Sequence, residues 1–280
     1  MKTLRIFAFA DEASPQIDGQ IAALRRNGLQ GLEIRNVDGQ NVSDISLEKA
    51  REVHKKLTDA GLSVWSIGSP IGKIDIQKDD FEQHLQKYLH TLEIARALGA
   101  EKLRMFSFYL PKGQDPAPFR QQVIDRLSRM AELAQGSGVA LCHENEKGIY
   151  GDVASRCLEI LQAVPQLQGV FDPANFVQCG QETWAAWEML RERITYMHIK
   201  DALPDGRVVP AGAGVGNVAR ILSAFRAQGG DAVTLEPHLQ VFSGLAGLER
   251  AGDTSDVGSY CYESNDAAFD AACAALKGIL

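Results

Sequence analysis

The chain has 280 residues, 45% of them hydrophobic, which is enough to build the core of one large α/β domain spanning residues 1–280. Its formal charge of −7 offers no basic stripe for a phosphate backbone, so nucleic acid is not an expected partner. The apolar stretch before Asp11 is too short for a signal peptide, no later run approaches a membrane span, and five scattered cysteines suit a reducing compartment. We therefore expect a cytoplasmic protein without a membrane partner.

The first half of the chain alternates strand-like and helix-like segments. Apolar residues at helical spacing follow Ser14-Pro15 and Ser46, which we expect to be helix N-caps, and glycines end these helices. The expected strands are 4–10, 31–35, 62–67 and 101–108, and the expected helices are 14–28, 46–61, 81–99 and 118–136.

The second half repeats this alternation four more times. Strands are expected at 139–144, 169–172, 194–198 and 232–236, with helices around 153–164, 183–193, 218–228 (capped by Asn217) and 266–277. Eight strand–helix units without a hairpin signal predict a (β/α)8 TIM barrel, and a doubly wound open sheet is the alternative. The irregular segment 237–264 would then lie over the barrel mouth as a lid or binding loop.

Four of these strands end on a residue that can bind a metal. Glu144, Asp172, His198 and Glu236 follow one another at intervals of 28, 26 and 38 residues, each long enough for one strand, one helix and their loops. The ligand set is mostly oxygen, which favours Mn²⁺ first, with Mg²⁺, Co²⁺ or Zn²⁺ as alternatives. Three carboxylates packed together need neutralisation, and a divalent ion is the simplest source.

Five short motifs in the C-terminal half add to this pattern. They are His-Glu-Asn-Glu-Lys-Gly at 143–148, Phe-Asp-Pro-Ala-Asn at 171–175, His-Ile-Lys-Asp at 198–201, Gly-Ala-Gly-Val-Gly at 212–216 and Leu-Glu at 235–236. With these motifs the chain resembles the xylose isomerase-like TIM barrels, a superfamily of sugar and sugar phosphate isomerases and epimerases. AP endonuclease family 2, with endonuclease IV, is a more distant part of it.

The resemblance implies roles for individual residues. It implies that Glu144, Asp172, His198 and Glu236 are the metal ligands, and that Glu144 and Glu236 are also the catalytic residues that move the proton. Many members carry a histidine three residues after the aspartate ligand, where this chain has Asn175, so no specific activity is carried over.

Further polar residues near the expected mouth are candidates for binding substrate. Glu146 shares a strand face with Glu144, and Lys200 lies two residues beyond His198, although a loop position or a solvated lysine would explain each as well. The predicted substrate-binding residues are Glu146, Asn175, Lys200, Arg35 and Lys73. The glycine-rich 212–216 segment is best explained as a tight loop, with phosphate binding as the alternative.

The sequence thus predicts a metal-dependent isomerase or epimerase acting on a sugar, polyol or sugar phosphate through an enediolate. A dehydratase or lyase acting on a keto-sugar or inosose at the same site is the alternative. Two interpretations are more distant: an endonuclease IV-like repair enzyme, for which only His143, His198 and His238 lie near the mouth, and a non-catalytic sugar-binding barrel. The expected partner is a small carbohydrate, and a homo-oligomer is compatible with the sequence.

Overall fold

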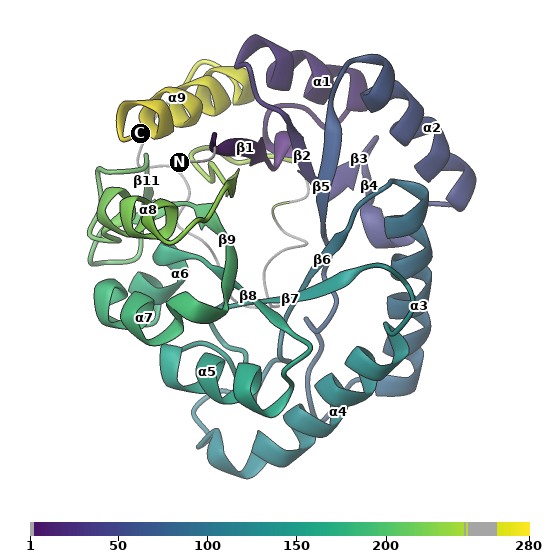
Figure 1. The fold of residues 1–280 in the computed structure, drawn as a ribbon, viewed down its shortest axis with the longest axis vertical. Coiled ribbons are helices and arrows are strands. Elements are labelled where there is room, and N and C mark those ends of the chain that lie inside the picture. The colour runs from purple at the N-terminus through teal and green to yellow at the C-terminus, as the bar shows by residue number, and fades with distance from the viewer. Residues whose placement is uncertain (1–2, 244, 246–261) are drawn as a thin grey trace.

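Eight parallel strands form a closed barrel in the order β1-β12-β9-β8-β7-β6-β5-β2. The computed structural model describes residues 3–243, 245 and 262–280 of the chain. The helices form a ring around the strands, and α9, in yellow, lies beside α1, in purple, where the ring closes (Figure 1). The prediction of a single-domain (β/α)8 barrel is confirmed.

The barrel strands and the surrounding helices lie close to the predicted segments. The strands are β1 (Arg5–Ala8), β2 (Gly31–Ile34), β5 (Ser63–Gly68), β6 (Lys102–Met105), β7 (Ala140–Glu144), β8 (Gln168–Phe171), β9 (Ile194–Ile199) and β12 (Ala232–Leu235). The helices are α1 (Ile17–Arg26), α2 (Leu47–Asp59), α3 (Phe81–Ala97), α4 (Arg120–Leu133), α5 (Ala154–Ala163), α6 (Pro173–Gln178), α7 (Thr183–Leu190), α8 (Val218–Ala227) and α9 (Asn265–Gly278). None of the helices in the described part of the chain is long and apolar enough to cross a membrane.

The inside of the barrel holds a small apolar cluster that is separate from the main core between strands and helices. Phe7, Cys142, Val170 and Tyr196 are buried in it, and Phe7 stacks on Trp65 with ring centroids 5.1 Å apart. Because side chains two residues apart share a strand face, this layer supports the residues that end the same strands. Its packing fixes the floor beneath the mouth of the barrel.

Of the predicted helix caps, Ser14 is wrong, and Asn217 occupies the N-cap position of α8 without a cap hydrogen bond from its side chain. The first helix begins at Ile17 rather than after Ser14, and its Ile17 N–H donates to Asp38 Oδ1 at 2.9 Å, so a side chain from another loop caps it. Asn217 has a left-handed φ of 55° and makes no cap hydrogen bond, since its side chain donates to Thr183 Oγ1 instead. The Ser46 cap is confirmed, because its Oγ accepts from the Lys49 N–H.

Several short elements were not predicted from the sequence. Two antiparallel ribbons occur, β3 (Asn36–Val37) with β4 (Gln40–Asn41) and β10 (Asp201–Ala202) with β11 (Val208–Val209), so the absence of hairpins was a wrong prediction. A 3-10 turn, η1 (Ala10–Glu12), follows β1 directly. Two-residue strands are too short for an alternating pattern to be read. Most of the predicted lid segment, residues 244 and 246–261, lies outside the described residues.

Candidate metal and active site

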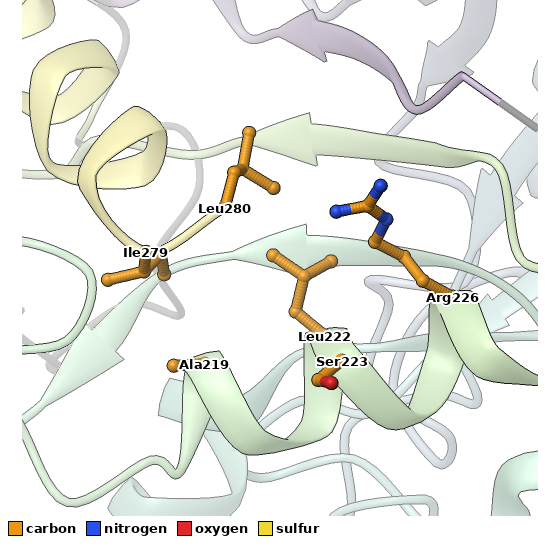
Figure 2. Close-up of a pocket in the computed structure, with 6 residues that line it drawn as sticks. All are labelled: Ala219, Leu222, Ser223, Arg226, Ile279 and Leu280. Atoms are coloured by element: carbon orange, nitrogen blue, oxygen red, sulfur yellow. The ribbon is translucent and has the colours of Figure 1, made fainter. Parts of the chain in front are cut away.

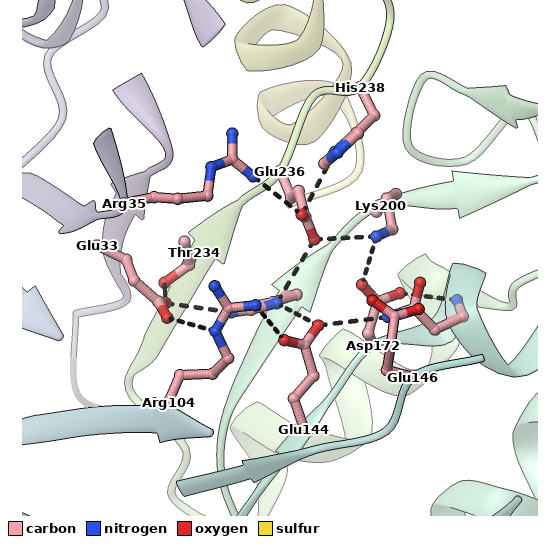
Figure 3. A network of polar contacts seen from close by, with 12 residues as sticks. Glu33, Arg35, Arg104, Glu144, Glu146, Asp172, Lys200, Thr234, Glu236 and His238 are labelled. Carbon is pink, nitrogen blue, oxygen red and sulfur yellow. Dashed lines mark hydrogen bonds and ion pairs between the residues drawn. The ribbon is translucent and has the colours of Figure 1, made fainter. Parts of the chain in front are cut away.

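The four candidate metal ligands meet at the carboxyl ends of neighbouring strands. Glu144 ends β7 and His198 lies near the end of β9, while Asp172 and Glu236 directly follow β8 and β12. All four are buried, and one ligand atom from each lies within 4.8 Å of the others. This is the end of a TIM barrel at which active sites lie. The structure therefore brings the four predicted ligands together (Figure 3).

His198 lies at the centre of this group. Its Nδ1 is 2.9 Å from Glu144 Oε1 and 3.5 Å from Glu236 Oε2, and its Nε2 is 3.1 Å from Glu33 Oε2. Burial alone would lower the pKa of His198, but the attraction of Glu144 and Glu33 raises it well above its ordinary value. The imidazole is thus fixed from both sides by carboxylates.

Glu33 is a site residue that the sequence analysis missed. It is fully buried in β2, where it also accepts hydrogen bonds from Tyr196 Oη at 3.1 Å and Thr234 Oγ1 at 2.9 Å. A carboxylate behind a histidine ligand orients the ring and makes it a better ligand. One signal was available: Glu33 stands two residues before Arg35, so the strand alternation places both on the barrel interior.

Glu144 is held in its ionised form by its neighbours. Arg104 Nη1 donates to Glu144 Oε2 at 2.8 Å, and Asn175 Nδ2 donates to Glu144 Oε1 at 3.3 Å. Burial raises the pKa of Glu144, but His198 and Arg104 together lower it to about 2. The carboxylate is therefore charged at neutral pH, as a ligand or a base must be.

Lys200 lies between the other two carboxylates. Its Nζ is 3.0 Å from Asp172 Oδ2 and 3.0 Å from Glu236 Oε2. Burial raises the pKa of Asp172 to about 7 in spite of Lys200, whereas Lys200, His238 and His198 overcome the effect of burial on Glu236 and lower its pKa well below the usual value. Lys200, one of the predicted substrate-binding residues, thus contacts two candidate ligands directly.

Asp172 tests whether these residues fit a metal. Its Oδ1 accepts from the Asn175 N–H and caps α6, while its buried Oδ2 makes no well-formed hydrogen bond and has only the ion-pair contact with Lys200. A buried oxygen in this condition is a suitable ligand atom. Together with two glutamates and an imidazole it forms a set that suits a divalent cation.

Arg35 is enclosed by carboxylates rather than exposed at the mouth. It is only 1% exposed, and its guanidinium makes two hydrogen bonds to Asp11 at 2.9 and 3.1 Å. The same group lies 3.0 Å from Glu12 Oε1 and 3.4 Å from Glu236 Oε1. These contacts give Arg35 a clear role in holding Glu236, and a contact with substrate stays a prediction.

Glu12 and His238 extend the cluster beyond the four ligands. Ligand atoms of Glu12, Glu236 and His238 lie within 4.8 Å of one another, and the His238 N–H donates to Glu12 Oε2 at 2.6 Å. Burial is the main reason that the pKa of Glu12 rises to about 8. Glu12 was not predicted from the sequence; it ends the 3-10 turn η1, four residues after β1.

Glu146 and Lys73 face each other at the rim. Lys73 Nζ donates to Glu146 Oε2 at 3.0 Å, and their side chains are 10% and 15% exposed. Asn175, the fifth predicted substrate residue, is buried and donates to the Asn145 carbonyl at 2.9 Å. All five predicted substrate residues therefore lie at or near the cluster, each with a partner from the chain itself. His143 points away from it, toward Ser107 Oγ at 2.9 Å.

The glycine-rich loop encloses a carboxylate of its own chain. Asp201 accepts hydrogen bonds from the N–H groups of Gly212, Gly214 and Gly216 at 2.9, 3.1 and 2.9 Å. A Cβ on Gly214 or Gly216 would lie 2.3 or 2.6 Å from Asp201 Oδ1, so only glycine permits this approach. The prediction of a tight loop agrees with this arrangement.

A separate surface pocket lies outside the barrel. It is between α8 and the C-terminus and has a volume of about 190 Å³ (Figure 2). Its lining is mostly aliphatic, with Leu222, Ile279 and Leu280 beside Arg226, and it contains none of the predicted site residues. The strand-end cluster therefore remains the candidate active site.

The model of the xylose isomerase-like TIM barrel family matches residues 21–252, which is most of the chain and includes every candidate ligand. This chain belongs to the xylose isomerase-like TIM barrel family. None of the curated proteins matches it in sequence.

Three solved structures with the same fold are similar to this chain over nearly their whole length. The probable 3-DHS dehydratase AsbF from Bacillus anthracis is 18% identical, with a TM-score of 0.74 and 98% of both chains covered. The 3-keto-D-glucoside 4-epimerase YcjR from E. coli is 15% identical, with a TM-score of 0.70 and 99% of both chains covered. A family protein from Mycobacterium smegmatis in complex with magnesium is 16% identical, with a TM-score of 0.70, covering 100% of this chain and 98% of that one. At these identities the similarity establishes the fold.

Proposed function

We propose that this barrel is a divalent-metal-dependent isomerase or epimerase that acts on a carbohydrate by proton transfer next to a carbonyl. The observation that supports it most is the buried group of three carboxylates and one imidazole at the strand ends, with ligand atoms within 4.8 Å of one another. A bound divalent ion would polarise the substrate carbonyl and offset the charge of the enediolate. We place Mn²⁺ first, before Mg²⁺, Co²⁺ and Zn²⁺.

Glu144 and Glu236 are the proposed proton carriers. They flank His198 Nδ1 at 2.9 and 3.5 Å, and both have lowered pKa values, so both are ionised before substrate arrives. One takes the proton from carbon and the other returns it, on the opposite face in an epimerase or on the neighbouring carbon in an isomerase. This requires two bases on two sides of one substrate carbon, which two different strands supply.

Lys200 and the residues around the glutamates have supporting roles in this proposal. Lys200 donates to Glu236 and lies against Asp172, so its ammonium group is placed to donate to a substrate oxygen beside the ligands. Glu33 orients the His198 ring, and Arg104 and Arg35 keep Glu144 and Glu236 charged. In this proposal the chain therefore supplies two ionised carboxylates as bases, one ammonium group as a hydrogen-bond donor, and an imidazole with a fixed orientation.

Metal content is the first test of this function. We expect about one divalent ion per chain by elemental analysis, a gain in thermal stability on adding Mn²⁺, and loss of activity on chelation. Activity is measured as exchange of a carbon-bound hydrogen for deuterium in D₂O, which an enediolate requires. A protein without metal that none of the four ions stabilises would refute the proposal.

The same cluster also suits elimination of water, so a dehydratase is the second candidate. Proton removal next to the carbonyl is shared by both reactions, and they differ in whether a hydroxyl then leaves. Of the three candidate carboxylate ligands, Asp172 is the one whose pKa ends above its usual value, at about 7 because of burial, so it is about half protonated at neutral pH. Products decide between the two: an epimer or isomer keeps its mass, whereas dehydration lowers it by one water.

A repair endonuclease is the distant alternative, and we expect it to fail in a nicking assay. Further histidine ligands would be required, yet the His143 ring is turned away from the cluster and contacts Ser107 Oγ at 2.9 Å. With a formal charge of −7 the protein should also lack the steep salt dependence of counterion release on duplex DNA. Metal-dependent cleavage of an abasic duplex would instead support the endonuclease.

For the isomerase or epimerase, we also propose a cytoplasmic location and a homo-oligomer.

A further inference from the structure

We infer that the substrate is an uncharged carbohydrate, a keto-sugar that carries neither a phosphate nor a carboxylate group. This inference rests on the proposed function and narrows it. Three features carry it: the pairing of the cations at the mouth, the surplus of acidic groups around them, and the carboxylate inside the glycine-rich loop.

The three cationic side chains among the predicted substrate residues, and Arg104 beside Glu144, are each paired with a carboxylate of the chain. The pairs are Arg35 with Asp11 at 2.9 Å, Lys73 with Glu146 at 3.0 Å, Arg104 with Glu144 at 2.8 Å, and Lys200 with Asp172 and Glu236 at 3.0 Å. A bound phosphate is normally held by charge-assisted hydrogen bonds from such groups. Here the charge of each of these groups is already balanced by a carboxylate, so an anion would have to compete for it, whereas a neutral substrate oxygen accepting from Lys200 would not.

Acidic groups outnumber these cations. Seven carboxyl groups lie in the described part of the mouth, against the four cationic side chains already named: Asp11, Glu12, Glu33, Glu144, Glu146, Asp172 and Glu236. With a divalent ion bound and His198 neutral as its ligand, the mouth would carry six positive charges against at most seven carboxylates, which leaves little net positive charge for an anion. A phosphate ester would add close to two negative charges, and in a buried site like charges repel strongly. Hydroxyl groups bring no such penalty, and carboxylates are good acceptors for them.

The phosphate position common in TIM barrels is filled by Asp201. Barrels often bind a phosphate near the last two strands, here β9 and β12, through loop N–H groups. In this chain the N–H groups of Gly212, Gly214 and Gly216, together with that of Ala202 at 2.9 Å, all donate to the Asp201 carboxylate. The loop therefore binds an internal anion in place of an external one.

Matched substrates test the inference. Metal-loaded protein is incubated in D₂O with D-fructose, D-ribulose and a 3-keto-glucoside, with the phosphate esters of the first two, and with 5-keto-D-gluconate as a carboxylate. We expect exchange on an uncharged member, and exchange at least about tenfold slower on its charged counterpart, because binding the charged form costs more. Faster exchange on a phosphate ester or on the keto-acid would overturn the inference.

Phosphate binding tests the charge of the ligand independently of turnover. We expect inorganic phosphate at about 10 mM to leave the thermal stability of the parent unchanged, and to stabilise Asp201→Ala, whose loop N–H groups have lost their acceptor. Asp205→Ala is the control, because Asp205 is exposed on the same connection and bonds only to Arg207.

The two measurements separate the inference from the proposed function. Absence of exchange on every compound would refute the proposed function while the phosphate result still decides the charge of the ligand. Any stabilisation of the parent by phosphate would overturn the inference even if exchange occurs. If Asp201→Ala does not fold, the response of the parent to phosphate is sufficient, since any stabilisation of the parent contradicts the inference.

Discussion

Glu144→Gln and Glu236→Gln are each expected to lower activity by roughly a hundredfold to ten-thousandfold, which is the usual contribution of a general base. Each amide keeps an oxygen that can coordinate weakly, so metal should still bind at saturating concentration while the basicity is lost. The two variants should differ in the substrate epimer or isomer whose hydrogen exchanges in D₂O, because each lacks the base for one face. Measuring metal content and exchange on the same samples separates ligand from base.

Glu132→Gln is the matched control for these variants, because Glu132 is exposed on α4 and lies away from the strand ends. It should exchange deuterium at the parent rate. If metal-loaded Glu144→Gln and Glu236→Gln also exchange at that rate, the two glutamates are ligands only. Glu146 and Lys200, the nearest remaining candidates, would then have to supply the base.

Arg35→Met is expected to destabilise the protein by about 3–5 kcal/mol, because it leaves buried carboxylates without their cation. The side chain is 1% exposed, is shared by Asp11, Glu12 and Glu236, and lies over the Phe9 ring at 4.4 Å. Methionine keeps most of the volume, so the lost charge and hydrogen bonds dominate. Chemical denaturation at neutral pH measures the difference in the free energy of unfolding.

Arg5→Met provides the comparison for this prediction. Arg5 also pairs with an aspartate, Asp231 at 3.1 Å, but its side chain is 42% exposed, and such pairs contribute only about 0–1 kcal/mol. If Arg35→Met and Arg5→Met are equally stable, the carboxylates around position 35 take up protons without cost, and the holding role of Arg35 is wrong.

The barrel was predictable because its signals are local and repeated. Each strand that ends in Glu144, Asp172, His198 or Glu236 is an apolar run bounded by turn residues, and parallel strands bring their carboxyl ends to one edge. The convergence of these four residues needs only the fold class. It does not depend on exact register, which is why sequence reasoning was sufficient.

The surroundings of the ligands were not predictable in the same way. Glu33 reaches His198 across the barrel, and Arg104 reaches Glu144 from the adjacent strand, so both contacts depend on strand register and tilt. The predicted cap of the first helix was wrong for a related reason. The Ile17 N–H is capped by Asp38, which lies in the β3–β4 hairpin, and this hairpin is too short to be predicted from sequence. Contacts between distant segments require the closed structure.

The candidate ligands and the residues that support them come from different halves of the chain. All four candidate ligands come from the second half of the chain, whereas Glu33, Arg35 and Arg104, which orient or neutralise them, come from the first. Glu33 and His198 are 165 residues apart in sequence and meet only when β1 joins β12 and β2. A C-terminal half-barrel produced alone would thus contain the complete ligand set, yet its histidine would turn freely and its glutamates would repel one another. Under the proposed function, high-affinity metal binding would therefore be a property of the joined halves, and it would report assembly if the two were mixed.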